Sequence, residues 1–318
     1  MSPPLLVVEN LQTRFNTRAG VVKAVDGVSF TLGRSETLAI VGESGCGKSV
    51  TALSLMRLVA DPPGRIVGGS VRLEDTELLA LDETAMRRVR GKLVSMIFQE
   101  PMTSLNPVMT IGRQIGESLV LHEGLSRRAA LARSVELLQL VGISEPAQRA
   151  REYPHQLSGG MRQRAMIAMA LACRPRVLIA DEPTSALDVT IQAQILELIG
   201  RLQRELGTAM IMITHDLGVV AETAEHVIVM YAGRKVEEAS VGELFARPLH
   251  PYTRGLMKSI PRGAARLQEI PGMVPALSNL PPGCAFAPRC PQASAKCRAM
   301  EIPYEEKQPG HWAACLYV

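Results

Sequence analysis

Aromatic side chains are scarce in this sequence. Phe, Trp and Tyr together make up 3% of its 318 residues, and only one of them is Trp. Surfaces that bind bases or sugars by stacking need aromatic rings, so this shortage argues against them. The charge balance agrees, because 35 basic and 31 acidic residues leave a net charge of only +4. We therefore expect no nucleic-acid partner.

Long apolar runs are also missing. The longest candidate, residues 165–173, ends at Arg174 and is about half of the roughly 18 residues that cross a bilayer. The N-terminus has neither the basic segment nor the cleavage site of a signal peptide. These absences predict a cytoplasmic protein, in which the six Cys residues would not form a disulfide framework.

The remaining composition, 47% hydrophobic and 21% charged, is typical of a globular protein. Strand-like and helix-like patterns alternate up to about residue 245, which predicts an α/β domain with a mostly parallel core sheet. Two β-rich segments near the N-terminus predict an antiparallel β subdomain, and residues 100–165 predict a helical subdomain. The expected strands are residues 5–15, 28–32, 36–41, 177–180, 209–213 and 226–231, and the expected helices are residues 49–56, 127–140, 162–173 and 190–206.

The composition changes after about residue 245. Eleven of the 21 Pro residues lie between positions 248 and 309, and four of the six Cys residues lie between positions 284 and 315. Proline removes backbone donors from helices and sheets, so we do not expect this tail to continue the α/β pattern. We expect two domains, residues 1–245 and a small Cys- and Pro-rich module over residues 246–318.

A phosphate-binding loop follows the expected strand 36–41. Residues 42–49 fit the pattern G-x-x-x-x-G-K-[ST], in which glycines let the backbone N–H groups point at phosphate oxygens. The next helix adds the partial positive charge of its N-terminus. Lys48, one of only seven Lys residues, would reach the terminal phosphates, and the Ser49 hydroxyl would bind Mg²⁺. The loop consists of Gly42, Glu43, Ser44, Gly45, Cys46, Gly47, Lys48 and Ser49.

Two carboxylates end a later apolar strand. Asp181 would hold the Mg²⁺ shell, and Glu182 would polarise an attacking water. Taken alone, an Asp-Glu pair after a strand could equally be a solvated helix cap. The phosphate-binding loop upstream favours the catalytic interpretation.

Ser158, Gly159 and Gly160 precede an expected helix and predict a second anion site. A Ser-Gly-Gly sequence alone is more often a flexible turn. One nucleotide needs only one such phosphate-binding site, so the second site would bind a nucleotide held by another subunit. His215 and Gln99 each follow an apolar run and, taken alone, carry no assignment.

In this order, the motifs resemble those of the ATP-binding subunits of ABC transporters. The resemblance covers residues 5 to about 240 and implies an ABC-type P-loop ATPase domain that binds ATP and Mg²⁺. It implies that Gln99 contacts Mg²⁺ and the attacking water and links to the membrane subunits. It also implies that Ser158 and Gly160 contact the γ-phosphate across a head-to-tail dimer.

The same resemblance implies three further roles. His215 would clamp the γ-phosphate. Asp188, which ends the segment 185–188, would bridge the two sites of the dimer. Phe15 would stack on adenine, although Tyr is more usual there.

Four further segments resemble the oligopeptide and dipeptide importers of the family, specifically the first of their two ATPases. They are residues 100–107, 153–156, 250–253 and 282–291. The implied function is to power peptide import at the cytoplasmic face of the bacterial inner membrane. The implied partners are a second ATPase subunit, two transmembrane permeases and an extracytoplasmic binding protein.

Nickel and glutathione importers share much of this pattern and stay as alternatives. A DNA-repair or chromosome-organising ATPase would insert a coiled coil or zinc fingers between Lys48 and Ser158, where there is no room. A translation factor of the ABC type would carry two such heads in one chain.

The last motif is the cysteine set of the tail: Cys284, Cys290, Cys297 and Cys315. A module this small generally needs a cross-link or a metal, and disulfides are not expected in a reducing compartment. Four thiolates suit Zn²⁺ or an iron–sulfur cluster. The wide, irregular spacing and the family resemblance favour a [4Fe–4S] cluster over Zn²⁺, and four unrelated buried thiols stay as the alternative.

Overall fold

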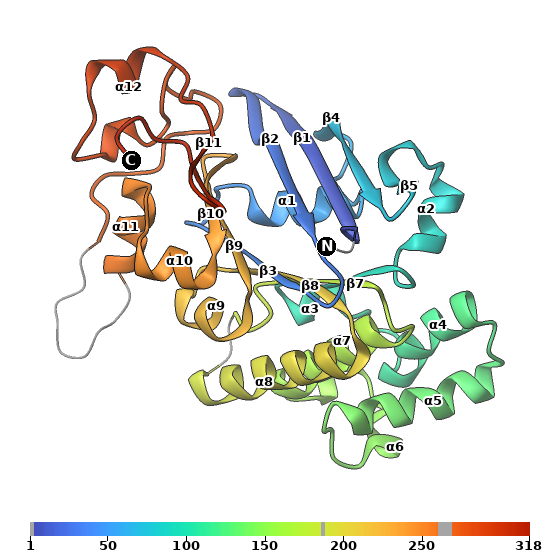
Figure 1. Cartoon of the computed structure of the whole chain (residues 1–318). Coiled ribbons are helices and arrows are strands. Elements are labelled where there is room, and N and C mark those ends of the chain that lie inside the picture. The colour runs from blue at the N-terminus through green and yellow to red at the C-terminus, as the bar shows by residue number, and fades with distance from the viewer. Residues whose placement is uncertain (1–2, 186–187, 260–268) are drawn as a thin grey trace. The chain divides into compact units, whose positions relative to one another are not determined.

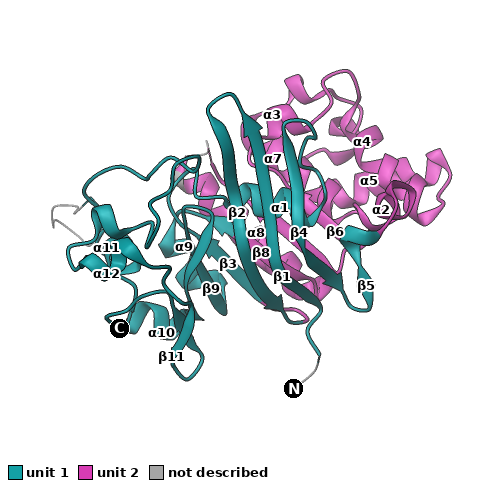
Figure 2. Cartoon of the chain, turned by 90° about the horizontal axis from the view of Figure 1, so that it is seen from above, with its two compact units in different colours: residues 1–33, 37–80, 213–318 teal, residues 34–36, 81–212 magenta. Residues whose placement is uncertain are grey.

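The computed structural model describes residues 3–185, 188–259 and 269–318 (Figure 1). The chain forms two compact units, which Figure 2 colours separately. Unit 1 comprises residues 1–33, 37–80 and 213–318, and unit 2 comprises residues 34–36 and 81–212. Two residues of the 185–188 motif, Ala186 and Leu187, lie outside the described residues. The predicted boundary near residue 245 stays a prediction.

Unit 1 contains the predicted antiparallel subdomain, in the strand order β2-β1-β4-β5. Its strands are β1 (Leu6–Thr17), β2 (Gly20–Leu32), β4 (Gly64–Leu73) and β5 (Thr76–Glu77). The strand predicted over residues 28–32 begins earlier, at Gly20, because β1 turns back at once. Gly20 has a positive φ of 116°, and the Thr17 hydroxyl donates to its carbonyl at 2.7 Å.

A second group of strands in unit 1 has the order β11-β12-β10-β9-β3. The strands are β3 (Thr37–Val41), β9 (His226–Tyr231), β10 (Arg234–Ser240), β11 (Glu305–Gln308) and β12 (His311–Ala313). β3 pairs with β9 in parallel, and β9 pairs with β10 antiparallel. The tail also contributes here, because β12 pairs with β10 at Glu237↔Ala313 and Glu238↔Trp312. The expectation that the tail leaves the α/β pattern is therefore wrong for these strands.

The helices of unit 1 cover an apolar core built on β3 and β9. Its buried members include Val41, Val229, Tyr231, Tyr252 and Phe286, so the tail packs into the same core. The helices are α1 (Lys48–Leu55), α9 (Leu217–Thr223), α10 (Val241–Ala246), α11 (Pro251–Lys258) and α12 (Ala295–Ala299), with short 3₁₀ turns at Leu78–Ala80 and Ala287–Arg289.

Unit 2 combines parallel strands with most of the helices. β6 (Val94–Ile97) and β7 (Val177–Asp181) pair in parallel, from Val94↔Val177 to Ile97↔Ala180, and β8 (Ala209–Thr214) lies next to β7. Ile97, Ala180 and Leu178 belong to one buried core with the helices. The helices are α2 (Glu83–Val89), α3 (Pro101–Ser104), α4 (Ile111–Glu123), α5 (Arg127–Leu140), α6 (Pro146–Arg149), α7 (Gly159–Leu171) and α8 (Val189–Leu206), with a 3₁₀ turn at Pro154–Gln156.

The predicted helix over residues 162–173 starts three residues earlier. Ser158 caps α7 by accepting a hydrogen bond from the Met161 N–H, so Gly159 and Gly160 form its first turn. Within the described ranges, no helix is long and apolar enough to cross a membrane.

Candidate functional site

The loop 42–49 joins the end of β3 to the start of α1, as the sequence predicts. Gly42 and Gly47 have positive φ values of 152° and 104°. A Cβ on Gly42 would lie 2.3 Å from the Met230 carbonyl oxygen, and one on Gly47 would lie 2.1 Å from that of Ala24. The loop therefore packs directly on the backbones of β9 and β2, and only glycine fits at these two positions.

The open side of the loop suits a phosphate. Ser44 and Gly45 are exposed, and a Cβ on Gly45 would meet nothing within 4 Å. Gly47 caps α1 without any side-chain hydrogen bond. Left-handed glycines ahead of a helix N-terminus form a concave set of N–H groups with a favourable dipole. These residues fit a nucleotide phosphate.

Lys48 folds back over this loop. Its side chain is buried, and its Nζ donates to the carbonyl oxygens of Gly42 at 2.7 Å and Glu43 at 3.1 Å. The ammonium group therefore lies at the loop, where a phosphate would sit. Cys46 is fully buried beneath the loop, and burial raises the pKa of its thiol despite the nearby Lys48.

Phe15 lies at the end of β1 and is half-buried. It pairs with Val22 of β2 and Gly64 of β4. A Cβ on Gly64 would come within 2.6 Å of the Phe15 ring, so Gly64 leaves space for this aromatic side chain. The ring rests on β4 and remains partly open to solvent.

The carboxylate site lies in unit 2, at the carboxyl ends of the neighbouring parallel strands β6 and β7. Gln99 Nε2 donates to Glu182 Oε2 at 3.0 Å, so the structure brings these two predicted residues together. Glu182 has a positive φ of 44°, an unusual conformation for a non-glycine residue. Ser185 reinforces the turn, because its hydroxyl donates to the carbonyls of Glu182 at 2.8 Å and Gln99 at 3.3 Å. Asp181 is buried at the strand end.

The remaining predicted site residues of unit 2 lie at the N-termini of two helices. Ser158 Oγ accepts from the Met161 N–H at 3.4 Å, and Asp188 caps α8 by accepting from the Ile191 N–H at 2.9 Å. A Cβ on Gly160 would lie 3.3 Å from the Ile191 side chain, so α7 and α8 approach closely at this point. His215 is exposed and follows β8, and it belongs to unit 1, which resumes at Ile213 within that strand.

The four tail cysteines lie together. Cys284, Cys290, Cys297 and Cys315 line one small cavity of about 20 Å³. Burial raises the pKa of Cys284 and Cys290, and the neighbouring Cys297 thiol adds to both shifts. Within the described part of the chain, no group of three or more His, Cys, Asp or Glu residues is arranged to hold a metal ion.

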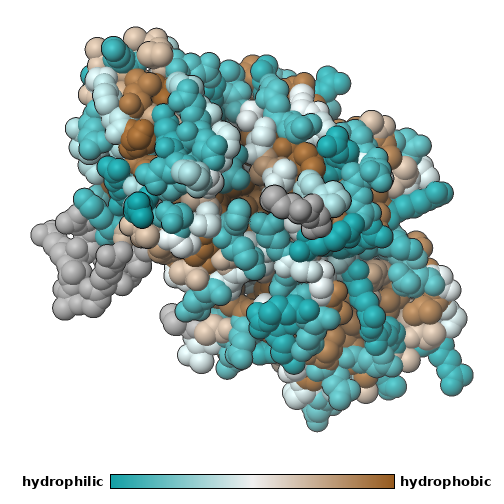
Figure 3. Space-filling model, in the orientation of Figure 1, coloured by the Kyte–Doolittle hydropathy of each residue, from teal (hydrophilic) through white to brown (hydrophobic). Residues whose placement is uncertain are grey.

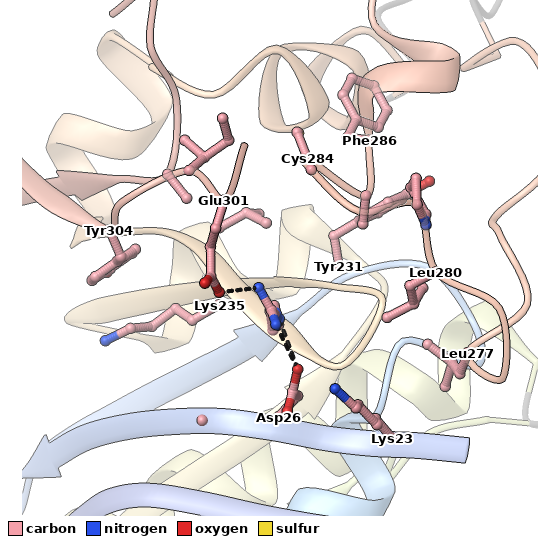
Figure 4. A pocket seen from close by; sticks show the side chains of 18 of the residues that line it. Lys23, Asp26, Tyr231, Lys235, Leu277, Leu280, Cys284, Phe286, Glu301 and Tyr304 are labelled. Atoms are coloured by element: carbon pink, nitrogen blue, oxygen red, sulfur yellow. Dashed lines mark hydrogen bonds and ion pairs between the residues drawn. The ribbon is translucent and has the colours of Figure 1, made fainter. Parts of the chain in front are cut away.

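A larger cavity, of about 1100 Å³, adjoins the cysteine cavity in unit 1 and shares Cys284 and Phe286 with it (Figure 4). β2 and β10 form one side, and the tail segments 277–286 and 301–304 form the other. Arg234 spans it, with 2.8 Å to Asp26 and 2.7 Å to Glu301. The loop 42–49 does not line this cavity, so it is separate from the phosphate site.

Sequence reasoning missed two tail residues that contact the loop. The Glu43 carboxylate forms an ion pair with Arg289, and the Glu43 N–H donates to Tyr252 Oη at 2.7 Å. Tyr252 belongs to the 250–253 motif, to which the sequence assigned no role. No local pattern could reveal either contact, because more than 200 positions separate the partners.

Comparison with known proteins places this site in a family. The sequence profile of the ABC transporter family matches residues 25–185, and that of the oligopeptide/dipeptide transporter C-terminal region matches residues 236–297. A dimeric, post-hydrolysis structure of the ATP-binding cassette MJ0796, bound to ADP and Pi, superposes with a TM-score of 0.66 at 27% identity. That match covers 74% of this chain and 98% of MJ0796.

Curated relatives match nearly the whole chain. A probable peptide ABC transporter ATP-binding protein, y4tR of Sinorhizobium fredii, is 58% identical over 98% of this chain and 94% of its own length. The oligopeptide transport ATP-binding protein AppD of Bacillus subtilis is 57% identical over 98% and 96%. The chain therefore belongs to the ABC transporter family, as one of its ATP-binding, ATP-hydrolysing cassettes.

Proposed function

We propose that this chain powers the import of dipeptides or oligopeptides by binding and hydrolysing ATP. The observation that carries this proposal is the match to relatives named as peptide-transport ATP-binding proteins, which extends through the tail. The tail match matters because the ATP site alone would serve many transported substrates.

The test is to purify the whole complex through a tag on this chain and identify its bound solute by mass spectrometry. We expect a peptide of two or more residues, together with a second ATPase chain and two permeases. Nickel or glutathione as the bound solute would contradict peptide import while leaving the ATPase assignment intact. A complex carrying the Glu182→Gln substitution is the matched control for solute lost during turnover.

The proposed roles at the nucleotide belong to several segments of the chain. The loop 42–49 binds the phosphates through its N–H groups and Lys48, and Phe15 stacks on adenine. Ser49, Gln99 and Asp181 would hold Mg²⁺, which supplies charge neutralisation at the phosphates.

Glu182 is the proposed general base, which orients and polarises the attacking water. Its hydrogen bond with Gln99 and its left-handed backbone support this role, because they hold the carboxylate at the strand end. His215 would contact the γ-phosphate. Catalysis of this kind depends on positioning and electrostatics.

The α7 N-terminus supports a second half-site. Ser158, Gly159 and Gly160 begin a helix of 13 residues, whose dipole favours an anion. We assign this anion to the γ-phosphate of a nucleotide bound by a second ATPase subunit, with Asp188 bridging the two sites. The dimeric cassette MJ0796 offers a precedent for pairing.

The segment after Gln99 is the proposed contact with the permeases, at the cytoplasmic face of the membrane. It carries two exposed apolar side chains, Met102 at 59% and Val108 at 78% exposure. Figure 3 shows the hydropathy of one face of the molecule, on which apolar (brown) side chains lie among polar ones.

We also propose that the four tail cysteines hold a [4Fe–4S] cluster, or alternatively Zn²⁺. Their convergence on one cavity supports the proposal, because four thiolates are a ligand set that suits either group. Such a site would stabilise the small Pro-rich tail.

Protein purified without oxygen is expected to be brown, to absorb broadly near ~400 nm as such clusters do, and to lose its colour in Cys290→Ser. Cys173→Ser, which removes a thiol of unit 2, is the matched control and should stay coloured. Colourless protein with stoichiometric zinc would assign Zn²⁺ instead. Folded protein without either metal would contradict both.

A further inference from the structure

Glu43 is the second residue of the phosphate-binding loop, and its N–H, its carbonyl and its carboxylate all form hydrogen bonds. Its N–H donates to Tyr252 Oη at 2.7 Å, and its carbonyl oxygen accepts from Lys48 Nζ at 3.1 Å. Its carboxylate accepts two hydrogen bonds from the Arg289 guanidinium, at 2.6 and 2.9 Å. Two of these three partners come from beyond residue 245.

Arg289 is built into the tail as a rigid donor. Its side chain is only 4% exposed. Its Nε donates to the Pro271 carbonyl at 3.0 Å, and its Nη2 donates to the Ile270 carbonyl at 3.1 Å. The same guanidinium contacts Tyr231 Oη at 3.4 Å. A two-pronged Arg–carboxylate pair of this kind is stronger and more directional than a single ion contact.

An aromatic cluster supports both contacts to Glu43. The ring centroids of Tyr231 and Tyr252 are 4.6 Å apart, and Phe286 lies 5.3 and 5.4 Å from them. All three side chains are buried. Figure 4 shows Tyr231 and Phe286 at the large cavity, on the tail side of unit 1. The cluster therefore packs β9, α11 and the turn before Arg289 against one another, and this packing positions Tyr252 and Arg289 at Glu43.

The negative charge of Glu43 is unfavourable for phosphate binding, and Arg289 neutralises it. A carboxylate in an anion-binding loop repels the phosphates, because like charges at short range raise the free energy of the bound state. The bidentate pair neutralises that charge and fixes the loop backbone at the same time. No other cation is paired with Glu43 among the ion pairs of the described residues.

We propose that Arg289 is a positioning residue of the phosphate-binding loop, through which the C-terminal region of this chain sets its affinity for ATP. The proposal deepens the proposed function and rests on the loop 42–49 binding the nucleotide phosphates. Arg289 does not contact ATP itself. It acts through Glu43.

The test measures ATP affinity of the full chain by titration calorimetry at low and high salt. Arg289→Met keeps a long side chain but removes the charge. We expect the Kd for ATP to rise by about 10- to 100-fold at low salt, because the Glu43 carboxylate loses its charged partner and repels the phosphates. The rise should shrink at high salt, because dissolved ions screen the partly exposed Glu43 carboxylate.

The double variant Glu43→Gln/Arg289→Met separates charge from packing. It removes the unpaired carboxylate as well, so we expect it to recover most of the lost affinity. Arg254→Met is the matched control, since Arg254 is exposed in the same region and its Nε donates to the Pro248 carbonyl rather than to the phosphate-binding loop. It should bind ATP as the unchanged chain does.

The outcomes distinguish the inference from the proposed function. If Lys48→Ala loses ATP binding while Arg289→Met retains it, the inference is wrong and the phosphate loop stands. If Lys48→Ala binds ATP normally, the proposed function of the loop fails first. If Arg289→Met is unfolded, Arg289→Lys replaces it. Arg289→Lys keeps the positive charge. A Kd for ATP like that of the unchanged chain would therefore support neutralisation of Glu43 as the role of Arg289, and a loss of ATP affinity that does not depend on salt would contradict it.

Discussion

Glu182→Gln is expected to retain ATP binding and to lower the rate of ATP hydrolysis by at least ~100-fold, the scale of losing a positioned general base. The amide has the shape of the carboxylate and can still accept the hydrogen bond from Gln99 Nε2, which is 3.0 Å long in the structure. The substitution therefore removes the basic group with little change in packing. Phosphate release from the purified complex measures the rate, and calorimetry measures the affinity.

The control for this prediction is Glu197→Gln. Glu197 is an exposed carboxylate on α8 of the same unit, so its substitution makes the same chemical change away from the site. It should hydrolyse ATP at the unchanged rate. A Glu182→Gln complex that turned over ATP as fast as this control would show that the base lies elsewhere.

Lys48→Ala is expected to act on binding instead. The Lys48 ammonium donates to the carbonyls of Gly42 and Glu43 and lies over the loop, where it would meet the terminal phosphates. A hydrogen bond to a charged group contributes about 1.5–3 kcal/mol, so we expect the Kd for ATP to rise by about 10- to 150-fold. Titration of the full chain with ATP measures it.

The matched control is Lys92→Ala, which removes a lysine whose Nζ donates to the His122 carbonyl in unit 2. Both variants should first be compared with the unchanged chain by thermal unfolding. Equal unfolding temperatures with weaker ATP binding only in Lys48→Ala would assign the effect to the phosphates. Unchanged binding in Lys48→Ala would remove Lys48 from the site.

Elements with a strong local signal were predicted closely. The strand over His226–Tyr231 and the helix over Arg127–Leu140 have the predicted bounds, because apolar periodicity and flanking turns specify them. Ends that depend on a side-chain contact were missed. α7 begins at Gly159 rather than Arg162 because the Ser158 hydroxyl caps it, which lets two glycines enter the helix.

The tail shows the limit of composition as a guide. Its prolines predicted that it would not continue the α/β pattern, yet β12 pairs with β10 and β11 pairs with β12. The partner edge of β10 supplies the hydrogen bonds, and the tail sequence contains no sign of it. The same holds for Phe286, which is buried in the core of unit 1 although it lies among prolines.

The sequence by itself determined the chemistry of this protein. The loop 42–49 and the pair Asp181–Glu182 predict phosphate binding and water activation from residue type and spacing alone, because that chemistry needs those groups close to one another. Only the tertiary structure decided that Gln99 meets Glu182 and that Arg289 meets Glu43. The first pair is separated by 83 positions and the second by 246. Such contacts arise from strand order and core packing, which no short segment of the sequence specifies.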